Sequence, residues 1–257
     1  NARMTAAELS RIARHCAPRA TIWTTGASPE AQAHAVAAGI AETVTPFGTV
    51  ALAGHDGADE ALPGDVAVIL YTTGTTGDPK GVMLSHGNLL FAGRASCGLR
   101  DLVAADRIYG ALPLTHVFGL ASMLMASATC GAEVQLETRF APAGLLAALR
   151  DGASVLPAVP QMHALLMKHT AELGITTLEG ARLRYVSSGA APLDPSWKRK
   201  AEAFYGLPLQ NGYGMTESTA GICGTRNPLG TTDVSVGPPL PGVDIAIDAP
   251  DGQGVGE

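Results

Sequence analysis

The sequence predicts an α/β fold, a mainly parallel β-sheet in layers with helices on both faces, and the start of a small β subdomain at the C-terminal end. Short apolar runs of strand length alternate with helical patterns over most of the chain, and this alternation is typical of parallel sheets. Hydrophobic residues make up 46% of the 257 residues and charged residues 16%. This balance favours a folded core over disorder.

The N-terminal part of the chain contains the signals of two capped helices. Residues 5–8 (Thr-Ala-Ala-Glu) form a capping box, which predicts a helix that runs to about His15. Ser28 caps a second helix with Pro29 at its first position, and Gly39 ends it.

The run 66–71 (Val-Ala-Val-Ile-Leu-Tyr) is the first predicted strand. It is apolar throughout, as expected of a strand buried on both faces of a sheet. A short strand is expected at 81–84, and Ser85 caps the helix that follows. Further strands are predicted near 107–112, 133–136, 154–156, 183–187 and 207–211, with helices near 117–129, 142–150, 160–170 and 195–205.

The C-terminal part changes character beyond Gly221. Glycine and proline become frequent, and residues 243–247 alternate as in an antiparallel strand. We therefore expect a first α/β subdomain over 1–104, a second over 105–220, and the start of a β-barrel-like subdomain over 221–257.

Composition argues against several classes of partner. The formal charge is −6 and no stripe of Lys and Arg is present, which argues against a nucleic-acid partner. The one basic cluster, 198–200, is expected on the solvated face of a helix. The four cysteines are scattered without a CxxC pair, so neither a zinc site nor a disulfide framework is indicated and a cytoplasmic location is expected. The apolar stretch 119–132 is too short for a membrane span.

The run 70–81 (Leu-Tyr-Thr-Thr-Gly-Thr-Thr-Gly-Asp-Pro-Lys-Gly) has the composition of a phosphate-binding loop. Glycine lets backbone N–H groups approach an anion closely, hydroxyls add donors, and Lys80 supplies a positive charge. The run lacks the GK[ST] ending of the Walker loop. A Gly/Thr-rich surface turn is the alternative, and the position of the run after an apolar strand favours phosphate binding.

Three other unusual segments also follow predicted strands, namely 113–116, 187–192 and 212–217. Ligands in open α/β sheets bind at the edge where the carboxyl ends of the strands lie. One such segment could arise by chance, whereas four together predict a binding site.

Each segment offers a different chemical group, and each has a structural alternative. Residues 188–191 lack bulk, so a flat ring could lie on their backbone, or they could be a turn packed under a helix. Tyr213 could stack on a base or be half-buried in the core. Thr216 and Glu217 place a hydroxyl beside a carboxylate, which suits a phosphate oxygen and Mg²⁺. His116 could orient a carboxylate, although a lone histidine among apolar residues is more often a core residue.

Together these motifs resemble those of the adenylate-forming enzymes, which include acyl- and aryl-CoA synthetases, peptide-synthetase adenylation domains and firefly luciferases. The similarity covers essentially the whole chain, and the matching motifs are 71–81, 113–116, 188–193, 211–217 and 236–242. The resemblance implies a phosphate-binding loop over 71–81 in the first subdomain, and an adenine and acyl site in the second.

The roles of individual residues follow from this resemblance alone. ATP phosphates are assigned to Thr72, Thr73, Gly74, Thr75, Thr76, Gly77 and Lys80. The adenine site is assigned to Ser188, Gly189, Ala190 and Ala191 on one side and to Asn211, Gly212, Tyr213, Gly214 and Met215 on the other. Thr216 is expected at the α-phosphate, Glu217 at Mg²⁺ and His116 beside the acyl carboxylate, and with Lys80 these form the expected catalytic set.

The resemblance also implies a reaction, that of an AMP-forming acid–thiol ligase. A carboxylate attacks the α-phosphorus of ATP, while Mg²⁺, Lys80 and aligned donors neutralise the charge that develops towards pyrophosphate. The thiol of coenzyme A then displaces AMP from the acyl-adenylate.

The chain departs from the family pattern in two ways. Thr115 stands where the family usually has an aromatic residue, which could reshape the entrance of the acyl pocket. The ribose-binding Asp and Arg motifs, the hinge, the small C-terminal domain with its catalytic lysine, and an opening stretch of the large domain are all missing. We therefore expect a fragment with little turnover by itself.

The acid is expected to be fatty or aryl. Segment 113–118 has no aspartate that could bind an α-amine, and Val117, Phe118 and Ile222 are apolar. Two alternatives stay open: a non-catalytic module that binds a nucleotide or an acyl-adenylate, and an adenylating enzyme that loads a carrier protein. Intact Lys80 and Glu217 count against a decayed site.

Overall fold

The computed structural model describes residues 2–56, 64–73 and 79–247. The contacts of the chain divide it into two compact units, Asn1–His86 and Gly87–Glu257, and each unit is described here by itself. The subdomain boundaries expected from the sequence, 1–104, 105–220 and 221–257, stay predictions.

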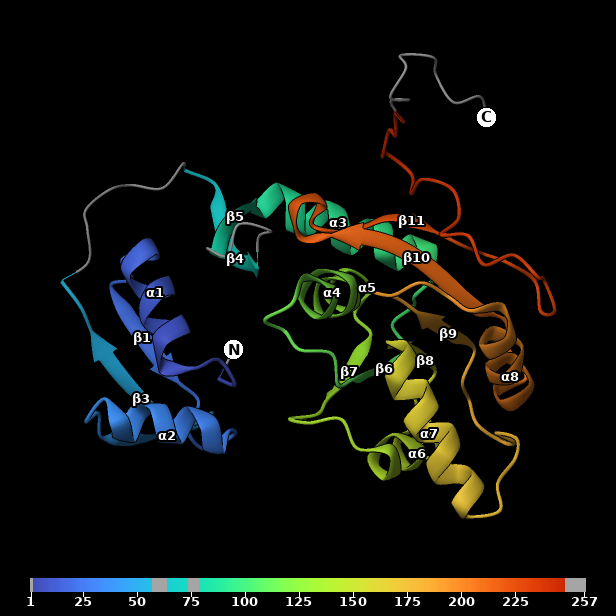
Figure 1. Cartoon of the computed structure of the whole chain (residues 1–257), viewed down its shortest axis with the longest axis horizontal. Coiled ribbons are helices and arrows are strands. Elements are labelled where there is room, and N and C mark those ends of the chain that lie inside the picture. The colour runs from blue at the N-terminus through green and yellow to red at the C-terminus, as the bar shows by residue number, and fades with distance from the viewer. Residues whose placement is uncertain (1, 57–63, 74–78, 248–257) are drawn as a thin grey trace. The chain divides into compact units, whose positions relative to one another are not determined.

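The first unit holds a three-stranded antiparallel sheet in the order β1-β3-β2, a separate β4–β5 hairpin, and two helices (Figure 1). Its elements are α1 (Ala6–Cys16), β1 (Ala20–Trp23), α2 (Pro29–Ala37), β2 (Glu42–Thr45), β3 (Gly48–Gly54), β4 (Val66–Thr73) and β5 (Pro79–Ser85). The predicted capping box is confirmed, because Thr5 Oγ1 accepts the Glu8 N–H at 3.3 Å and the Glu8 carboxylate accepts the Thr5 N–H at 2.7 Å. Strands β1 to β3 were not predicted from the sequence: β1 and β2 have only four residues each and no continuous apolar run, and most residues of all three strands are exposed or only partly buried.

The run 66–71 is a strand, but the prediction that it is buried on both faces is wrong. Strand β4 pairs with the next strand in the chain, β5, as an antiparallel hairpin with Tyr71 opposite Gly81. Its side chains over 66–72 are only partly buried. This is expected because β4 belongs to a two-stranded sheet and not to the centre of a larger one. The expected strand at 81–84 is longer than predicted and begins at Pro79.

The second unit contains a six-stranded sheet in the order β11-β10-β9-β8-β6-β7. Its strands are β6 (Arg107–Gly110), β7 (Glu133–Leu136), β8 (Val155–Ala158), β9 (Tyr185–Ser188), β10 (Leu209–Met215) and β11 (Ala220–Gly224). All neighbouring pairs are parallel except β10 and β11, which form an antiparallel hairpin. The expected mainly parallel α/β sheet is therefore confirmed.

The helices of this unit lie on both faces of the sheet. They are α3 (His86–Leu99), α4 (Val117–Gly119), α5 (Ala126–Cys130), α6 (Pro142–Arg150), α7 (Pro160–Glu172) and α8 (Pro195–Tyr205). The chain moves one way across the sheet from β6 to β7 and then the other way from β7 through β8 and β9 to β10. Because crossovers between parallel strands are right-handed, α4 and α5 cover one face and α6, α7 and α8 the other. The direction reverses between β6 and β8, which is where such sheets bind ligands.

Two sequence predictions in this unit need correction. The helix expected at 117–129 is divided by a π-helical segment, Leu120–Met125, between α4 and α5. Residues 243–247 form no strand. Their alternating pattern suits a strand, but a strand also needs a partner, and no described strand pairs with them.

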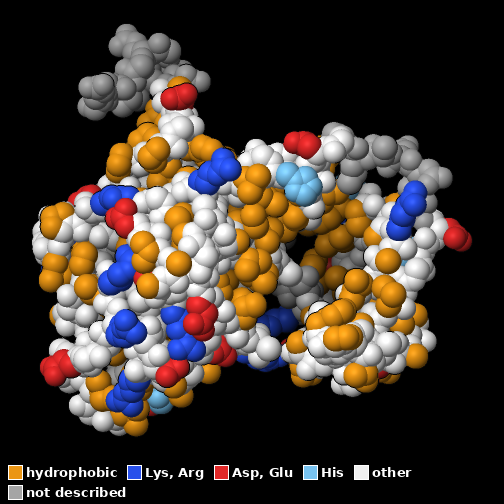
Figure 2. All heavy atoms as spheres, turned by 180° about the vertical axis from the view of Figure 1, so that it is seen from behind, with side chains coloured by type: hydrophobic (Ala, Val, Ile, Leu, Met, Phe, Trp, Pro, Cys, Tyr) orange, Lys and Arg blue, Asp and Glu red, His pale blue; other side chains and the backbone are white. Residues whose placement is uncertain are grey.

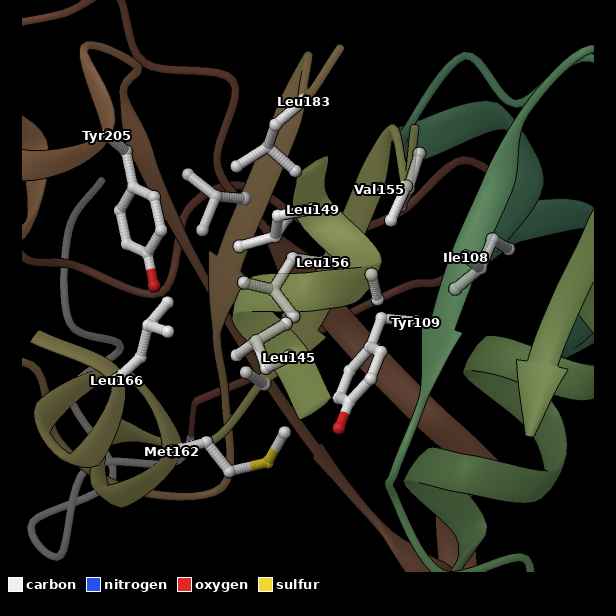
Figure 3. Close-up of a cluster of buried hydrophobic side chains, with 14 of the residues drawn as sticks. Ile108, Tyr109, Leu145, Leu149, Val155, Leu156, Met162, Leu166, Leu183 and Tyr205 are labelled. Atoms are coloured by element: carbon white, nitrogen blue, oxygen red, sulfur yellow. The ribbon is translucent and has the colours of Figure 1, made fainter. Parts of the chain in front are cut away.

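The hydrophobic core of the second unit lies between its sheet and helices α6, α7 and α8. Figure 3 shows Leu145 and Leu149 of α6 pointing towards Leu156 of β8, with Tyr109 and Ile108 of β6 on the other side. These side chains are fully or almost fully buried. The core thus fixes the positions of the strands whose carboxyl ends carry the predicted site.

Candidate functional site

Three of the four predicted segments meet at the carboxyl edge of the six-stranded sheet. They follow β6, β9 and β10, and β8, β9 and β10 are direct neighbours. Ser188 at the end of β9 lies opposite Ala158 of β8 and opposite Asn211 of β10. Strand pairing therefore brings residues 188–191 beside residues 211–217.

The segment after β9 presents its backbone, as the absence of bulky side chains predicts. Ser188 is buried, whereas Ala190 and Ala191 are exposed. Ala190 has φ 64°, in the left-handed region that costs a non-glycine residue free energy. A Cβ placed on Gly189 would lie 3.1 Å from Cε1 of Phe118. The ring of Phe118 thus packs against this backbone and joins the segment after β6 to the segment after β9.

Asn211 is buried, and its partners were not foreseen from the sequence. Its side-chain Nδ2 donates to the carbonyl oxygens of Val234 and Ser235 at 3.1 and 2.9 Å. Its backbone N–H donates to Thr225 Oγ1 at 2.8 Å. The polar composition of 231–235 was the one available signal, and it does not identify a partner 23 or 24 residues away.

Tyr213 presents its aromatic ring to solvent at the end of β10, with 50% of the residue exposed. With half of its surface buried, the residue is compatible both with stacking on a base and with the alternative of a half-buried packing role, so its role stays a prediction. The β10–β11 ladder shifts register between Tyr213 and Gly214. A Cβ on Gly214 would lie 1.7 Å from the Ala220 carbonyl oxygen, so this close approach of two backbones requires glycine. Met215 is also exposed.

Thr216 and Glu217 lie in a tight turn directly after β10. The turn is held by Ser218, whose Oγ accepts the Met215 N–H at 3.2 Å and donates to the Ala220 carbonyl at 3.0 Å. Glu217 is exposed and Thr216 is partly buried. No group of three or more His, Cys, Asp or Glu side chains in the described parts of the chain is arranged to hold a metal ion.

His116 is exposed at the N-terminus of α4, so the alternative of a core histidine is wrong. Its Nδ1 accepts the Phe118 N–H at 3.1 Å, which leaves the proton of the neutral ring on Nε2. The ring is thereby oriented by the same short helix whose Phe118 contacts Gly189.

The fourth predicted segment belongs to the first unit. Thr72 and Lys80 lie opposite each other in the β4–β5 hairpin, and Lys80 is exposed. Tyr71 Oη lies 2.7 Å from Nδ1 of His15 at the end of α1. Burial and the neighbouring Cys16 raise the pKa of Tyr71 to about 12. The backbone of Thr73 is in β4, while Gly74, Thr75, Thr76 and Gly77 lie outside the described residues.

Charge is mixed over the second unit. On the face drawn in Figure 2, Lys and Arg side chains alternate with Asp and Glu over the larger body on the left. Within the described residues, no helix combines the length and apolarity needed to cross a bilayer.

Comparisons with known proteins agree on one family. The family model described as AMP-binding enzyme matches residues 1–257. The chain is 36% identical over 185 residues to 4-coumarate–CoA ligase-like 3 of Oryza sativa subsp. japonica, a match that covers 67% of this chain and 31% of the relative. It is 34% identical over 191 residues to the long-chain-fatty-acid–CoA ligase of Bacillus subtilis (strain 168), covering 71% of this chain and 33% of the relative. The chain therefore spans about a third of the length of these curated relatives.

Solved structures give the same result. ATP-bound MatB from Rhodopseudomonas palustris is similar with a TM-score of 0.66 and 30% identity, covering 89% of this chain and 46% of that one. The O-succinylbenzoate coenzyme A synthetase of Bacillus subtilis, in complex with ATP and magnesium, is similar with a TM-score of 0.64 and 30% identity over 73% of this chain and 38% of that one. From its sequence motifs, its sheet topology and these matches, the chain belongs to the family of AMP-binding enzymes.

Proposed function

We propose that this chain carries the nucleotide- and acyl-adenylate-binding part of an enzyme that activates a carboxylic acid with ATP and transfers the acyl group to coenzyme A. The observation that carries the proposal is the meeting of 113–118, 188–191 and 211–217 at one edge of the parallel sheet. These segments supply a flat backbone wall, an exposed aromatic ring, a hydroxyl, a carboxylate and an imidazole.

The adenine base is proposed to lie between two surfaces. Gly189, Ala190 and Ala191 offer a wall without bulk, and the exposed ring of Tyr213 offers a stacking face. Asn211, fixed by its hydrogen bonds to 234 and 235, provides a polar group at the same edge. Ser188, Gly212, Gly214 and Met215 are proposed to shape the same site.

The phosphates and the magnesium ion call for oxygen and cation donors. Glu217 is exposed next to Thr216, and Mg²⁺ in nucleotide sites commonly takes one or two carboxylates and completes its shell with phosphates and water. A single carboxylate without a preformed metal cluster fits that pattern. Mg²⁺ bound there would neutralise negative charge on the polyphosphate.

The phosphate groups are further assigned to the first unit. Thr72 offers a hydroxyl, and Lys80 is exposed with its ammonium group accessible to an anion. Thr73 and residues 74–77, which lie outside the described residues, are proposed to bind the β- and γ-phosphates with their backbone N–H groups.

The acid is proposed to be a fatty or aryl carboxylic acid. His116 is exposed with Nε2–H free to donate to a carboxylate, and the partly buried Phe118 and Ile222 supply apolar surface. Relatives named for a long-chain fatty acid and for 4-coumarate support this class. Transfer to coenzyme A is supported by the same names, whereas a carrier-protein acceptor or a purely binding role would be alternatives.

The first test is binding by this chain. Thermal unfolding is followed with Mg-ATP, with AMP, and with non-hydrolysable sulfamate analogues of a fatty and an aryl acyl-adenylate. Ligand at 100 times its Kd stabilises by about 2.7 kcal/mol, which raises Tm by several degrees at this size. We expect the acyl-adenylate analogues to give the largest rise.

A pair of variants makes the test specific to the site. Tyr213→Ala removes the exposed ring at the sheet edge and should reduce every nucleotide-dependent rise in Tm. Phe47→Ala removes another exposed aromatic ring, in the first unit, and should change none of them. A wild-type chain whose Tm responds to no adenine-containing ligand would contradict the proposed function.

A further inference from the structure

Lys198 of α8 is buried, although its basic cluster was expected on a solvated face. Only 1% of the residue is exposed, whereas Arg199 and Lys200 are exposed. Its Nζ donates to the carbonyl oxygen of Asp233 at 3.0 Å and also to that of Thr231. The ammonium group therefore holds the backbone of 231–235, which we call the 231–235 segment.

Glu202, one helical turn further along α8, completes the buried pair. Its Oε1 lies 3.6 Å from Lys198 Nζ and accepts the backbone N–H of Leu209 at 3.1 Å. Leu209 is the first residue of β10. The pair thus ties α8 both to the start of β10 and to the 231–235 segment.

The 231–235 segment in turn fixes the side chain of Asn211. Both acceptors of the Asn211 amide, the carbonyl oxygens of Val234 and Ser235, belong to this segment. An asparagine amide has two N–H donors and one acceptor oxygen. With both donors used, Oδ1 is the group through which this amide can meet a ligand.

Asp233 stiffens the segment from its solvent side. Its Oδ1 accepts the Ser235 N–H at 2.8 Å, and its Oδ2 accepts the Ser235 hydroxyl at 3.0 Å and the Asn227 side-chain amide at 3.1 Å. Asp233 itself is exposed. Replacing it disturbs the segment without opening the core around Lys198.

We propose that Lys198 is a positioning residue for the nucleotide site: it holds the 231–235 segment against α8, and this segment fixes the Asn211 amide with Oδ1 available to a bound base. The inference rests on the proposed function and adds a residue that lies outside the ligand-binding edge. Lys198 touches no substrate in this scheme and acts through Asn211.

The energetics of burial support a positioning role. Removing an ammonium ion from water is costly, and apolar residues of similar volume often replace buried ion pairs without loss of stability. A methionine would fill the same space in α8, but it has no donors. Two donors of the lysine are taken by backbone carbonyls, and the Glu202 carboxylate lies within ion-pair distance, which fixes a loop that packing alone would not orient.

A fixed amide should discriminate between bases. Oδ1 accepts a hydrogen bond from the amino group of adenine and is repelled by the carbonyl that hypoxanthine has at the same position. A rotated or mobile amide would lose this difference. The ratio of the Kd values for IMP and AMP therefore reports on the orientation of Asn211, which a general loss of stability would not change.

The experiment compares the wild-type chain with Lys198→Met, Asp233→Ala and the control Lys200→Met, which removes an exposed lysine from the same helix. Calorimetric titration gives the Kd for AMP and for IMP. Two-dimensional ¹H–¹⁵N spectra of the ligand-free chain give the exchange rate of the Asn211 side-chain amide protons. Asp233→Ala keeps the test decisive if Lys198→Met does not fold.

We expect both Lys198→Met and Asp233→Ala to speed exchange of the Asn211 amide protons, to weaken AMP binding about tenfold and to lower the IMP-to-AMP ratio of Kd towards one. Lys200→Met should match the wild type. AMP binding and a base preference that stay unchanged in Lys198→Met and Asp233→Ala overturn the inference while leaving the proposed function intact. A wild-type chain that binds neither nucleotide contradicts the proposed function, and the inference with it.

Discussion

A buried histidine beneath the candidate site should make stability depend on pH between 7 and 5. His163 of α7 has no exposed surface. Its Nε2 lies 3.2 Å from the Ser187 carbonyl oxygen and its Nδ1 lies 2.8 Å from Tyr205 Oη. A carbonyl can only accept, so Nε2 carries the proton and Nδ1 accepts from the tyrosine. Protonation of Nδ1 would place a charge inside the core and leave the Tyr205 hydroxyl proton without its acceptor.

The size of the effect follows from the pKa of the imidazole. Burial lowers the pKa of His163 from 6.5 to about 4, although the hydrogen bond to Ser187 opposes this shift. Below pH 6.5 the unfolded chain takes up a proton that the folded chain does not bind until about pH 4. Stability is therefore present above pH 6.5 and is lost as the pH falls. Between pH 7 and pH 5 this single group should remove about 2 kcal/mol.

The measurement is urea unfolding of the wild type, His163→Gln and His169→Gln at pH 7, 6 and 5. Glutamine can donate to Ser187 and accept from Tyr205 without titrating. His169 lies on the same helix and is partly exposed, so its replacement is the matched control. We expect the free energy of unfolding to fall by about 2 kcal/mol less in His163→Gln than in the other two chains. Equal pH dependence in all three chains would refute the assignment of a neutral buried imidazole.

Three further outcomes are expected. Gly214→Ala should unfold the β10–β11 hairpin locally and abolish nucleotide binding, because the added Cβ would lie 1.7 Å from the Ala220 carbonyl oxygen. An unchanged circular dichroism spectrum together with wild-type binding would contradict this. Asp106→Ala should lower the free energy of unfolding, measured in urea, by about 3 kcal/mol, because it leaves Arg184 without the carboxylate that it binds at 2.8 Å. A loss below about 1 kcal/mol would show that solvent replaces the carboxylate. Glu217→Gln should raise the Mg²⁺ concentration needed for ATP binding about tenfold while leaving AMP binding in the absence of Mg²⁺ unchanged, as measured by titration calorimetry.

The carboxylate of Asp106 illustrates a feature of the sheet that the sequence did not reveal. Burial alone would raise its pKa, but the Arg184 guanidinium, the Val103 N–H and the Ser154 hydroxyl hold the pKa at about 2. Val103 is a local partner, but Ser154 and Arg184 lie 48 and 78 residues further along the chain. No local pattern of charge or hydropathy encodes such a contact, so only the folded sheet brings the groups together.

Most helices and parallel strands of the second unit were predictable, because caps and apolar runs act between residues that are close in the sequence. Helix α8 spans the predicted 195–205, with Asp194 capping its start and the left-handed Gly206 its end, because caps act within a few residues of the helix end. Strands β1 to β3 of the first unit, and the pairing of β4 with β5, were not predictable in this way. Their burial depends on pairing, and pairing is decided by the rest of the fold.

The sequence by itself determined the family, the parallel sheet and the types of residue at its carboxyl edge, because glycine-rich turns, caps and apolar runs act through neighbouring residues. The tertiary structure decided which of those residues meet. It placed Ser188 beside Asn211, packed Phe118 on Gly189 and buried Lys198 where a solvated lysine was expected. Each of these contacts joins residues far apart in the chain, and their free energy exists only when the whole sheet is folded.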